Sequence, residues 1–165
     1  MKKIVFWVVL VFLLKGTYMS QEKTDPSREK ELVKQTALDY VEGWFDGDAE
    51  RMARALHPEL VKRALVIRFP ASGRWILSPV NAESMIEMTR AGTGKLGPDV
   101  RGIFITVYDV FDNIANVKVE SSPYIDYLQL AKQDGRWRIV NVLWTQNNTP
   151  RLPLPNRFPP PATKK

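Results

Sequence analysis

The last third of the chain constrains the fold most, because apolar residues recur there at the spacing of half-buried strands. Residues 115–121 (ANVKVES) alternate apolar and polar side chains strictly. We therefore expect Ala115, Val117 and Val119 to share one buried face. Asp134-Gly135 is a typical hairpin turn between two longer runs rich in β-branched and aromatic residues. The pattern predicts an antiparallel meander of strands at residues 103–111, 115–121, 125–133 and 136–146.

The first part of the chain has the one-sided apolar spacing of helices. Asp25 and Pro26 are suited to begin a helix, and Gly47 is suited to end it. Pro58 follows a short second helix, and we interpret it as the start of a further helical turn. The predicted elements are helices at residues 25–46, 49–56 and 82–91, a helical turn at 58–63, and a hairpin of strands at 65–69 and 74–77.

Helices followed by a long antiparallel sheet indicate the α+β class, with the helices packed on one face of the sheet. Long strands twist and curve a sheet. A helix that lies across the concave side leaves a conical space, which can hold a small ligand without any special motif. We therefore expect a cone-shaped α+β fold, with N-terminal helices packed on a curved antiparallel β-sheet.

The two ends of the chain differ in composition from its middle. Lys2 and Lys3 precede eleven apolar residues at 4–14, which is typical of a secretory signal peptide, and an uncleaved anchor is the alternative. This run is shorter than the roughly 20 residues that span a bilayer. Six of the twelve prolines lie in residues 150–165, which favours extended or disordered chain. We expect a signal peptide at 1–20, one domain at 21–147, a tail at 148–165, and export to the periplasm or the extracellular space.

Charge and residue counts exclude several classes of function. Three of the 24 Lys and Arg residues lie in the first 20 residues and four lie after residue 150, which leaves 17 basic against 18 acidic residues between them. The domain is therefore nearly neutral, and we expect no nucleic acid as a partner. The chain has no Cys and a single His, so we expect no metal and no cofactor.

Four segments resemble the nuclear transport factor 2-like superfamily, and within it the subgroup of putative lumazine-binding proteins. They are residues 40–48 (YVEGWFDGD), 56–58 (LHP), 126–130 (DYLQL) and 134–141 (DGRWRIVN). The resemblance covers about residues 28–146. It implies the cone fold and a homodimer formed through the sheet. It does not imply one activity, because the superfamily includes isomerases, polyketide cyclases, dehydratases and non-enzymatic binders.

Five residues are candidates for contact with a small apolar or aromatic ligand. Aromatic rings on the apolar face of the first helix either pack in the core or stack on a flat ligand. The single histidine, His57, is at the position where the family has a histidine at the edge of the pocket. It either bonds a ligand or acts as a general base, or else it caps the second helix or bonds a nearby backbone carbonyl. The candidate ligand-binding residues are Tyr40, Trp44, His57, Tyr127 and Trp144.

Asp126 is a candidate general base if its carboxyl group faces the cavity, and the alternation of side chains along a strand decides which face it takes. It shares a face with Leu128 and Leu130, whose burial would carry the carboxyl group toward the cavity. A salt bridge with Arg63 or Arg138 is the alternative interpretation.

Asp109 and His57 are the other candidates for catalysis. Asp109 shares the predicted face of the apolar residues 103–107. None of these residues forms a full isomerase set of one base and two acidic donors, so we expect an exported small-molecule-binding protein without catalysis. The alternatives are an isomerase, dehydratase or cyclase that uses His57 or an inward Asp as base, and a dimeric interaction module.

Overall fold

The computed structural model describes residues 25–69 and 74–147. The predicted signal peptide at 1–20 and the predicted tail at 148–165 lie outside the described residues, as does the turn of the first hairpin. Within the described ranges, no helix is long and apolar enough to cross a membrane.

Three α-helices form close to the predicted positions. Asp25 caps the first helix by accepting a hydrogen bond of 2.9 Å from Ser27 N, and Gly47 ends it with φ of 73°. Asp48 and Asn81 cap the two shorter helices in the same way. The helices are α1 (Pro26–Asp46), α2 (Ala49–Ala55) and α3 (Ala82–Arg90), and a short 3-10 helix, η2 (Pro98–Val100), follows α3.

One six-stranded sheet contains all the strands among the described residues, in the order β2-β1-β6-β5-β4-β3. The meander β3-β4-β5-β6 is antiparallel, as predicted. The sheet as a whole is mixed rather than antiparallel, because β1 pairs parallel with β6. The strands are β1 (Leu56–Phe69), β2 (Arg74–Asn81), β3 (Phe104–Phe111), β4 (Ile114–Glu120), β5 (Tyr124–Gln133) and β6 (Arg136–Gln146).

The predicted helical turn at residues 58–63 is wrong, because these residues belong to β1. The pairing of β1 with β6 shifts register between Leu56 and Val61, and Pro58 lies in this irregular stretch. A proline lacks the N–H that a regular ladder position needs, so the irregularity accommodates it within a strand.

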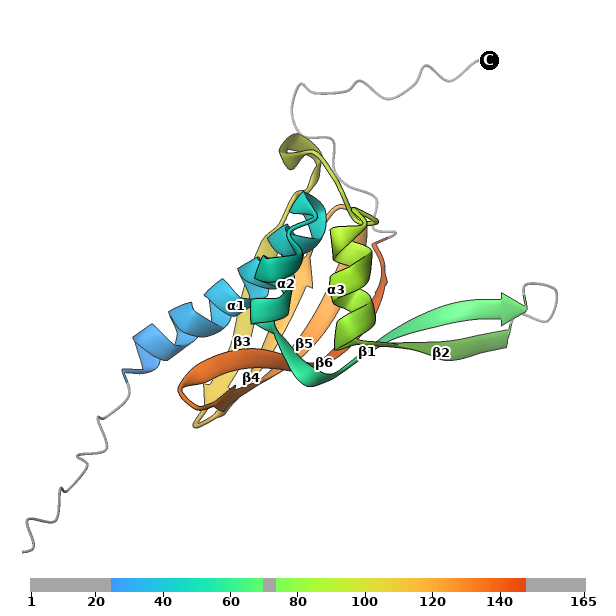
Figure 1. Cartoon of the computed structure of the whole chain (residues 1–165). Helices are drawn as coiled ribbons and strands as arrows, with labels where there is room; N and C mark the ends of the chain where they lie inside the picture. Colours follow the sequence, from blue (N-terminus) through green and yellow to red (C-terminus); the bar gives the residue numbers. More distant parts are fainter. Residues whose placement is uncertain (1–24, 70–73, 148–165) are drawn as a thin grey trace, which may run out of the picture.

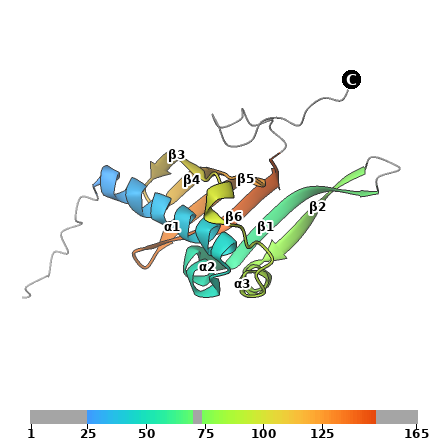
Figure 2. The same cartoon turned by 90° about the horizontal axis from the view of Figure 1, so that it is seen from above.

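The three helices lie on one side of the curved sheet, and the β1–β2 hairpin projects beyond them (Figures 1 and 2). The core fills the space between this face and the helices. Its largest fully buried side chains include Phe45 of α1 and Met52 of α2, which face Leu128, Leu130 and Ile139 of the sheet. The α+β architecture and its curved sheet are therefore as predicted.

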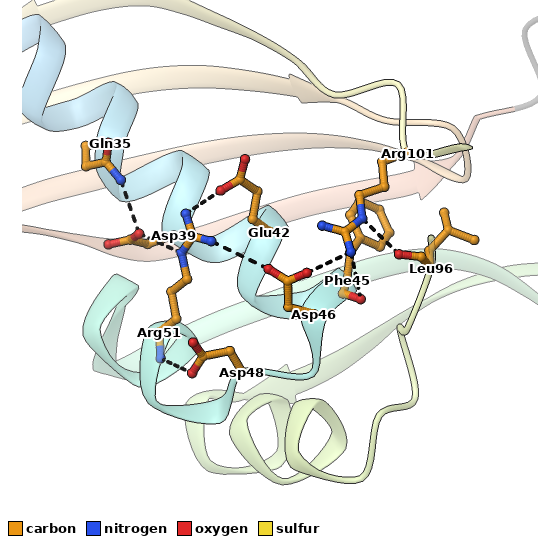
Figure 3. A network of polar contacts seen from close by, with 9 residues as sticks. All are labelled: Gln35, Asp39, Glu42, Phe45, Asp46, Asp48, Arg51, Leu96 and Arg101. Atoms are coloured by element: carbon orange, nitrogen blue, oxygen red, sulfur yellow. Dashed lines mark hydrogen bonds and ion pairs between the residues drawn. The ribbon is translucent and has the colours of Figure 1, made fainter. Parts of the chain in front are cut away.

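A network of ion pairs joins α1 to α2 and to the segment after η2 (Figure 3). Arg51 of α2 bonds Asp39 at 2.8 Å, also bonds Glu42, and lies 3.6 Å from Asp46. Arg101 bonds the other carboxylate oxygen of Asp46 at 2.7 Å. This network fixes the outer face of α1, while the opposite face of the helix meets the sheet.

Candidate functional site

A cavity of about 230 Å³ lies between α1, α3 and the inner face of the sheet. Its wall is mostly apolar, and aromatic rings from α1, β5 and β6 form much of it. A concave apolar wall with a few convergent polar groups is the usual form of a small-molecule site. The lining residues are Tyr40, Val41, Trp44, Phe45, Lys62, Val80, Met85, Met88, Thr93, Tyr124, Asp126 and Trp144.

Three polar side chains from three elements meet in the wall of this cavity. Tyr40 Oη of α1 donates a hydrogen bond of 2.8 Å to Asp126 Oδ1 of β5. Lys62 Nζ of β1 lies 3.0 Å from the same oxygen and also donates to Tyr40 Oη. Asp126 is only 3% exposed, so the lysine supplies the countercharge that a buried carboxylate needs.

The strand register brings Lys62 and Asp126 together. Asp126 pairs with Trp144 across β5 and β6, and Lys62 pairs with Val142 across β1 and β6. Trp144 and Val142 are two residues apart, so they share the inner face of β6. The lysine and the aspartate therefore flank β6 on the same side of the sheet.

Aromatic rings surround the lysine. Lys62 Nζ lies 4.9 Å from the ring centroid of Trp144 and 5.0 Å from that of Tyr40, within the range of cation–π attraction. Tyr124 meets Trp144 edge to face, with centroids 5.2 Å apart. The indole of Trp144 is thus held between a cation and a second ring.

Tyr40 stays protonated over a wide pH range. Burial raises the pKa of its hydroxyl well above the ordinary value of 10.0, and the negative charge of Asp126 and the hydrogen bond to it raise that pKa further. The hydroxyl therefore remains a donor to Asp126 at any pH near neutrality.

The cavity adjoins a second, more open hollow, with which it shares Phe45, Thr93 and Tyr124. The loop after α3 lies against the cavity wall at this end. A Cβ atom on Gly94 would be 2.1 Å from Cε2 of Trp44, so only glycine permits this close approach.

The structure brings some of the predicted site residues together in this cavity and separates others. Tyr40, Trp44 and Trp144 line it. Asp126 also faces it, on the inner face with the buried Leu128, as the alternation along β5 predicted. Its ionic partner is Lys62, rather than either arginine that we considered.

His57 lies outside the cavity lining. It stands near the start of β1, where Nδ1 accepts a hydrogen bond of 3.1 Å from Glu59 N. Nε2 therefore carries the proton and donates to Gln133 Oε1 at 3.1 Å. The imidazole thus has a structural role, but its backbone partner is an N–H group rather than the carbonyl that we considered. Within the described ranges, no three His, Cys, Asp or Glu side chains are grouped as a metal site would need.

Tyr127 and Asp109 also lie away from the cavity. Tyr127 is 50% exposed on the outer face of the sheet, because its neighbour Asp126 takes the inner face. Asp109 is exposed as well. A register shift between Val107 and Asp109 interrupts β3, and such a bulge reverses the faces of the residues that follow it.

Lys62 and Tyr124 line the cavity but were not among the predicted site residues. We assigned Lys62 to a helical turn, where a lysine between Val61 and Arg63 is an ordinary surface residue. In a strand, Lys62 shares a face with Leu60 and Ala64, which are 2% and 4% exposed. The signal that could have identified Lys62 is a lysine two residues from both Leu60 and Ala64, which is the spacing of one strand face.

The chain matches a family model described as "Putative lumazine-binding" over residues 28–145. Solved structures similar to it are nuclear transport factor 2-like proteins of unknown function. One from Silicibacter pomeroyi DSS-3 has a TM-score of 0.59 at 18% identity, over 75% of this chain and 100% of that one. One from Shewanella baltica OS155 has a TM-score of 0.60 at 14% identity, over 76% of this chain and 99% of that one. A search of curated proteins gives no match. The resemblance seen in the sequence is confirmed, and the structural similarities show the fold.

Proposed function

The chain belongs to the Putative lumazine-binding family, and from this premise we propose that it binds a small, flat, partly apolar molecule in the cone cavity without catalysing a reaction. The observation that carries this proposal is the cavity of about 230 Å³, with the aromatic rings of Tyr40, Trp44, Tyr124 and Trp144 in its wall. Flat rings stack favourably on such side chains. The cavity volume suits a molecule of one or two fused rings.

A thermal-shift screen against a library of flat metabolites tests this proposal. A ligand that binds only the folded state stabilises it by RT ln(1 + [L]/Kd), so the melting temperature rises with ligand concentration. Thr93→Trp places a large ring at the end of the cavity next to the second hollow, and it should abolish the shift. Glu83→Trp, on the exposed surface of α3, is the matched control and should keep it. A library that raises no melting temperature contradicts the proposal.

A second proposal concerns the outer face of the sheet, which we infer to be the interface of a homodimer. Tyr127 and Leu143 are paired neighbours on this face and are 50% and 48% exposed. Phe111 and Ile114 form another exposed apolar pair, 72% and 60% exposed, at one end of it. Exposed apolar groups of this extent are typical of protein interfaces.

Light scattering tests the homodimer. Leu143→Arg should give a monomer, since it puts a charge in the centre of the proposed interface. Leu32→Arg is the control on α1, where Leu32 is 40% exposed on the helical side of the molecule, and it should leave the dimer intact. A wild-type protein that is monomeric at high concentration contradicts the proposal.

We also propose that the protein acts outside the cytoplasm, in the periplasm or the extracellular space. The basic start and apolar run of residues 2–14 support this. N-terminal sequencing of the protein recovered from cells tests it: loss of about the first 20 residues is expected, and an intact N-terminus in the cytoplasm would contradict it.

An isomerase, dehydratase or cyclase with Asp126 as general base is the alternative function. The inward position of Asp126 supports it. Against it, the lining among the described residues contains no second carboxyl group and no imidazole. Turnover of a bound ligand, followed by mass spectrometry, would favour the enzyme over the binder.

A further inference from the structure

The polar end of the cavity has an unused hydrogen-bond donor. The ammonium group of Lys62 has three N–H bonds. Tyr40 Oη and Asp126 Oδ1 accept two of them, and none of the described residues supplies a third acceptor. The side chain of Lys62 lines the cavity, so the remaining N–H is available to a molecule bound there.

The same end of the cavity has an unused acceptor. Asp126 Oδ1 receives both hydrogen bonds, from Tyr40 and from Lys62. Its other oxygen, Oδ2, receives none from the part of the chain that the structure describes. No side-chain polar atom in that part is both fully buried and without a partner, so Oδ2 keeps some access. Because Asp126 is 3% exposed and lines the cavity, this access is from the cavity.

Charge limits what can occupy these two positions. Lys62 and Asp126 form an ion pair at 3.0 Å, so the polar end is neutral overall. A charged ligand group would be attracted by one of these residues and repelled by the other, so it would gain little net Coulomb energy and would still lose its hydration in this apolar wall. A neutral group that offers one donor beside one acceptor satisfies both residues.

We propose that the ligand presents a lactam or imide edge to this pair, with its N–H donating to Asp126 Oδ2 and its carbonyl oxygen accepting from Lys62 Nζ. The groups that offer the two open positions are in contact at 3.0 Å, and the N–H and C=O of such an edge are neighbours in the same way. The ring that carries the edge would lie beside Trp144, whose ring centroid is 4.9 Å from the ammonium group. This inference rests on the proposed binding function and specifies its ligand class.

Three probes of the same ring size test the ligand class. 2-Quinolone has a lactam N–H and C=O, 1-methyl-2-quinolone keeps the carbonyl but lacks the N–H, and naphthalene has neither. Quenching of tryptophan fluorescence gives Kd for each. Hydrogen bonds to charged groups in a closed site are worth a factor of about ten or more in affinity. We expect 2-quinolone to bind at least about tenfold more tightly than either of the other two.

Two variants assign the two contacts separately. Asp126→Asn presents an amide in place of the carboxylate, so 2-quinolone should lose its advantage over 1-methyl-2-quinolone. Lys62→Gln should weaken binding of both carbonyl compounds and leave naphthalene unchanged. Asp109→Asn and Lys118→Gln repeat these changes on β3 and β4, at residues that do not line the cavity, and should have no effect. Should Asp126→Asn fail to fold, Lys62→Gln and the three probes still decide the question.

Equal affinity for all three probes would overturn the lactam inference while leaving the cavity as an apolar binding site. A preference for 2-quinolone that persists unchanged in both Lys62→Gln and Asp126→Asn would also overturn it. If none of the three probes binds, the lactam inference fails, and the thermal-shift screen then decides the proposed binding function by itself.

Discussion

Tyr40 and Asp126 are 86 residues apart in the chain, and their side chains form a hydrogen bond of 2.8 Å that joins α1 to β5 beside the cavity. The bond is buried, and Lys62 of β1 donates hydrogen bonds to both of its oxygen atoms. The candidate site and the packing of the first helix on the sheet therefore depend on the same three polar groups.

Tyr40→Phe should destabilise the protein without changing its fold. The change removes the hydroxyl group that donates to Asp126 and accepts from Lys62. The buried carboxylate of Asp126 is left with fewer partners. We expect a loss of about 1–3 kcal/mol in the free energy of unfolding, measured by urea denaturation at pH 7. Tyr127→Phe removes the same hydroxyl from an exposed ring and should cost less than about 0.5 kcal/mol. Equal losses in the free energy of unfolding for the two variants would mean that the buried hydrogen bond contributes no more to stability than an exposed hydroxyl group does.

A second polar contact attaches the beginning of α1 to the β5–β6 hairpin. Glu29 is 7% exposed and accepts hydrogen bonds of 2.8 Å from Lys132 Nζ and 2.7 Å from Trp137 Nε1. Burial by itself would raise the pKa of Glu29. The hydrogen bonds from Lys132 and Trp137 outweigh it, helped by the charges of Lys132 and Arg28, and lower this pKa below its ordinary value of 4.5.

Stability should therefore fall in acid partly through Glu29. A carboxyl group with a lowered pKa in the folded state stabilises the protein fully above the pKa of the unfolded chain. This contribution is lost as the pH falls below 4.5 and through the folded-state pKa. Urea denaturation at pH 7 and at pH 3 should show a smaller pH dependence for Glu29→Gln than for the wild type. Glu31→Gln, on the exposed side of the same helix, should keep the wild-type dependence; an identical curve for both variants would contradict the prediction.

Local patterns predicted the meander and the orientation of Asp126, because burial alternates without interruption along β5 from residue 126 to 130. The same reasoning failed at Asp109, where one extra residue in β3 reverses the faces. No local signal announces such a bulge, since it is defined by pairing with a second strand. Face assignments from sequence hold only as far as the register is regular.

The position of Lys62 depended on long-range pairing in the same way. Pro58 indicated a helical turn locally, and the parallel contact of β1 with β6 overrides it. This contact joins residues about 80 positions apart and leaves no trace in a short window of sequence. The rings of α1 and β6 could be predicted from one helix and one strand, whereas Tyr124 of β5 and the ion pair could not.

Arg51→Met should loosen the contact between α1 and α2. Arg51 bonds Asp39 and Glu42 and approaches Asp46, and its side chain is 21% exposed. Removing it leaves three carboxylates close together without their shared cation. We expect a loss of about 1–2 kcal/mol, above the usual value for an isolated surface pair because several charges act as a network. Arg54→Met, on the exposed side of α2, is the control and should be nearly neutral in thermal denaturation. Equal melting temperatures for the two variants would contradict this account.

Gly94→Ala should disturb the cavity, although residue 94 does not line it. The new methyl group would lie 2.1–2.4 Å from three atoms of the Trp44 indole, so the loop after α3 or the indole must move. Overpacking of this kind costs about 1–3 kcal/mol. We expect a changed indole N–H signal of Trp44 in NMR spectra and weaker binding of any ligand that contacts this ring. Gly97→Ala is the matched control, because no atom lies within 4 Å of its added Cβ and its φ of −62° is ordinary for alanine. If Gly94→Ala leaves the Trp44 signal and the melting temperature at the values of Gly97→Ala, the loop does not hold Trp44 against the cavity.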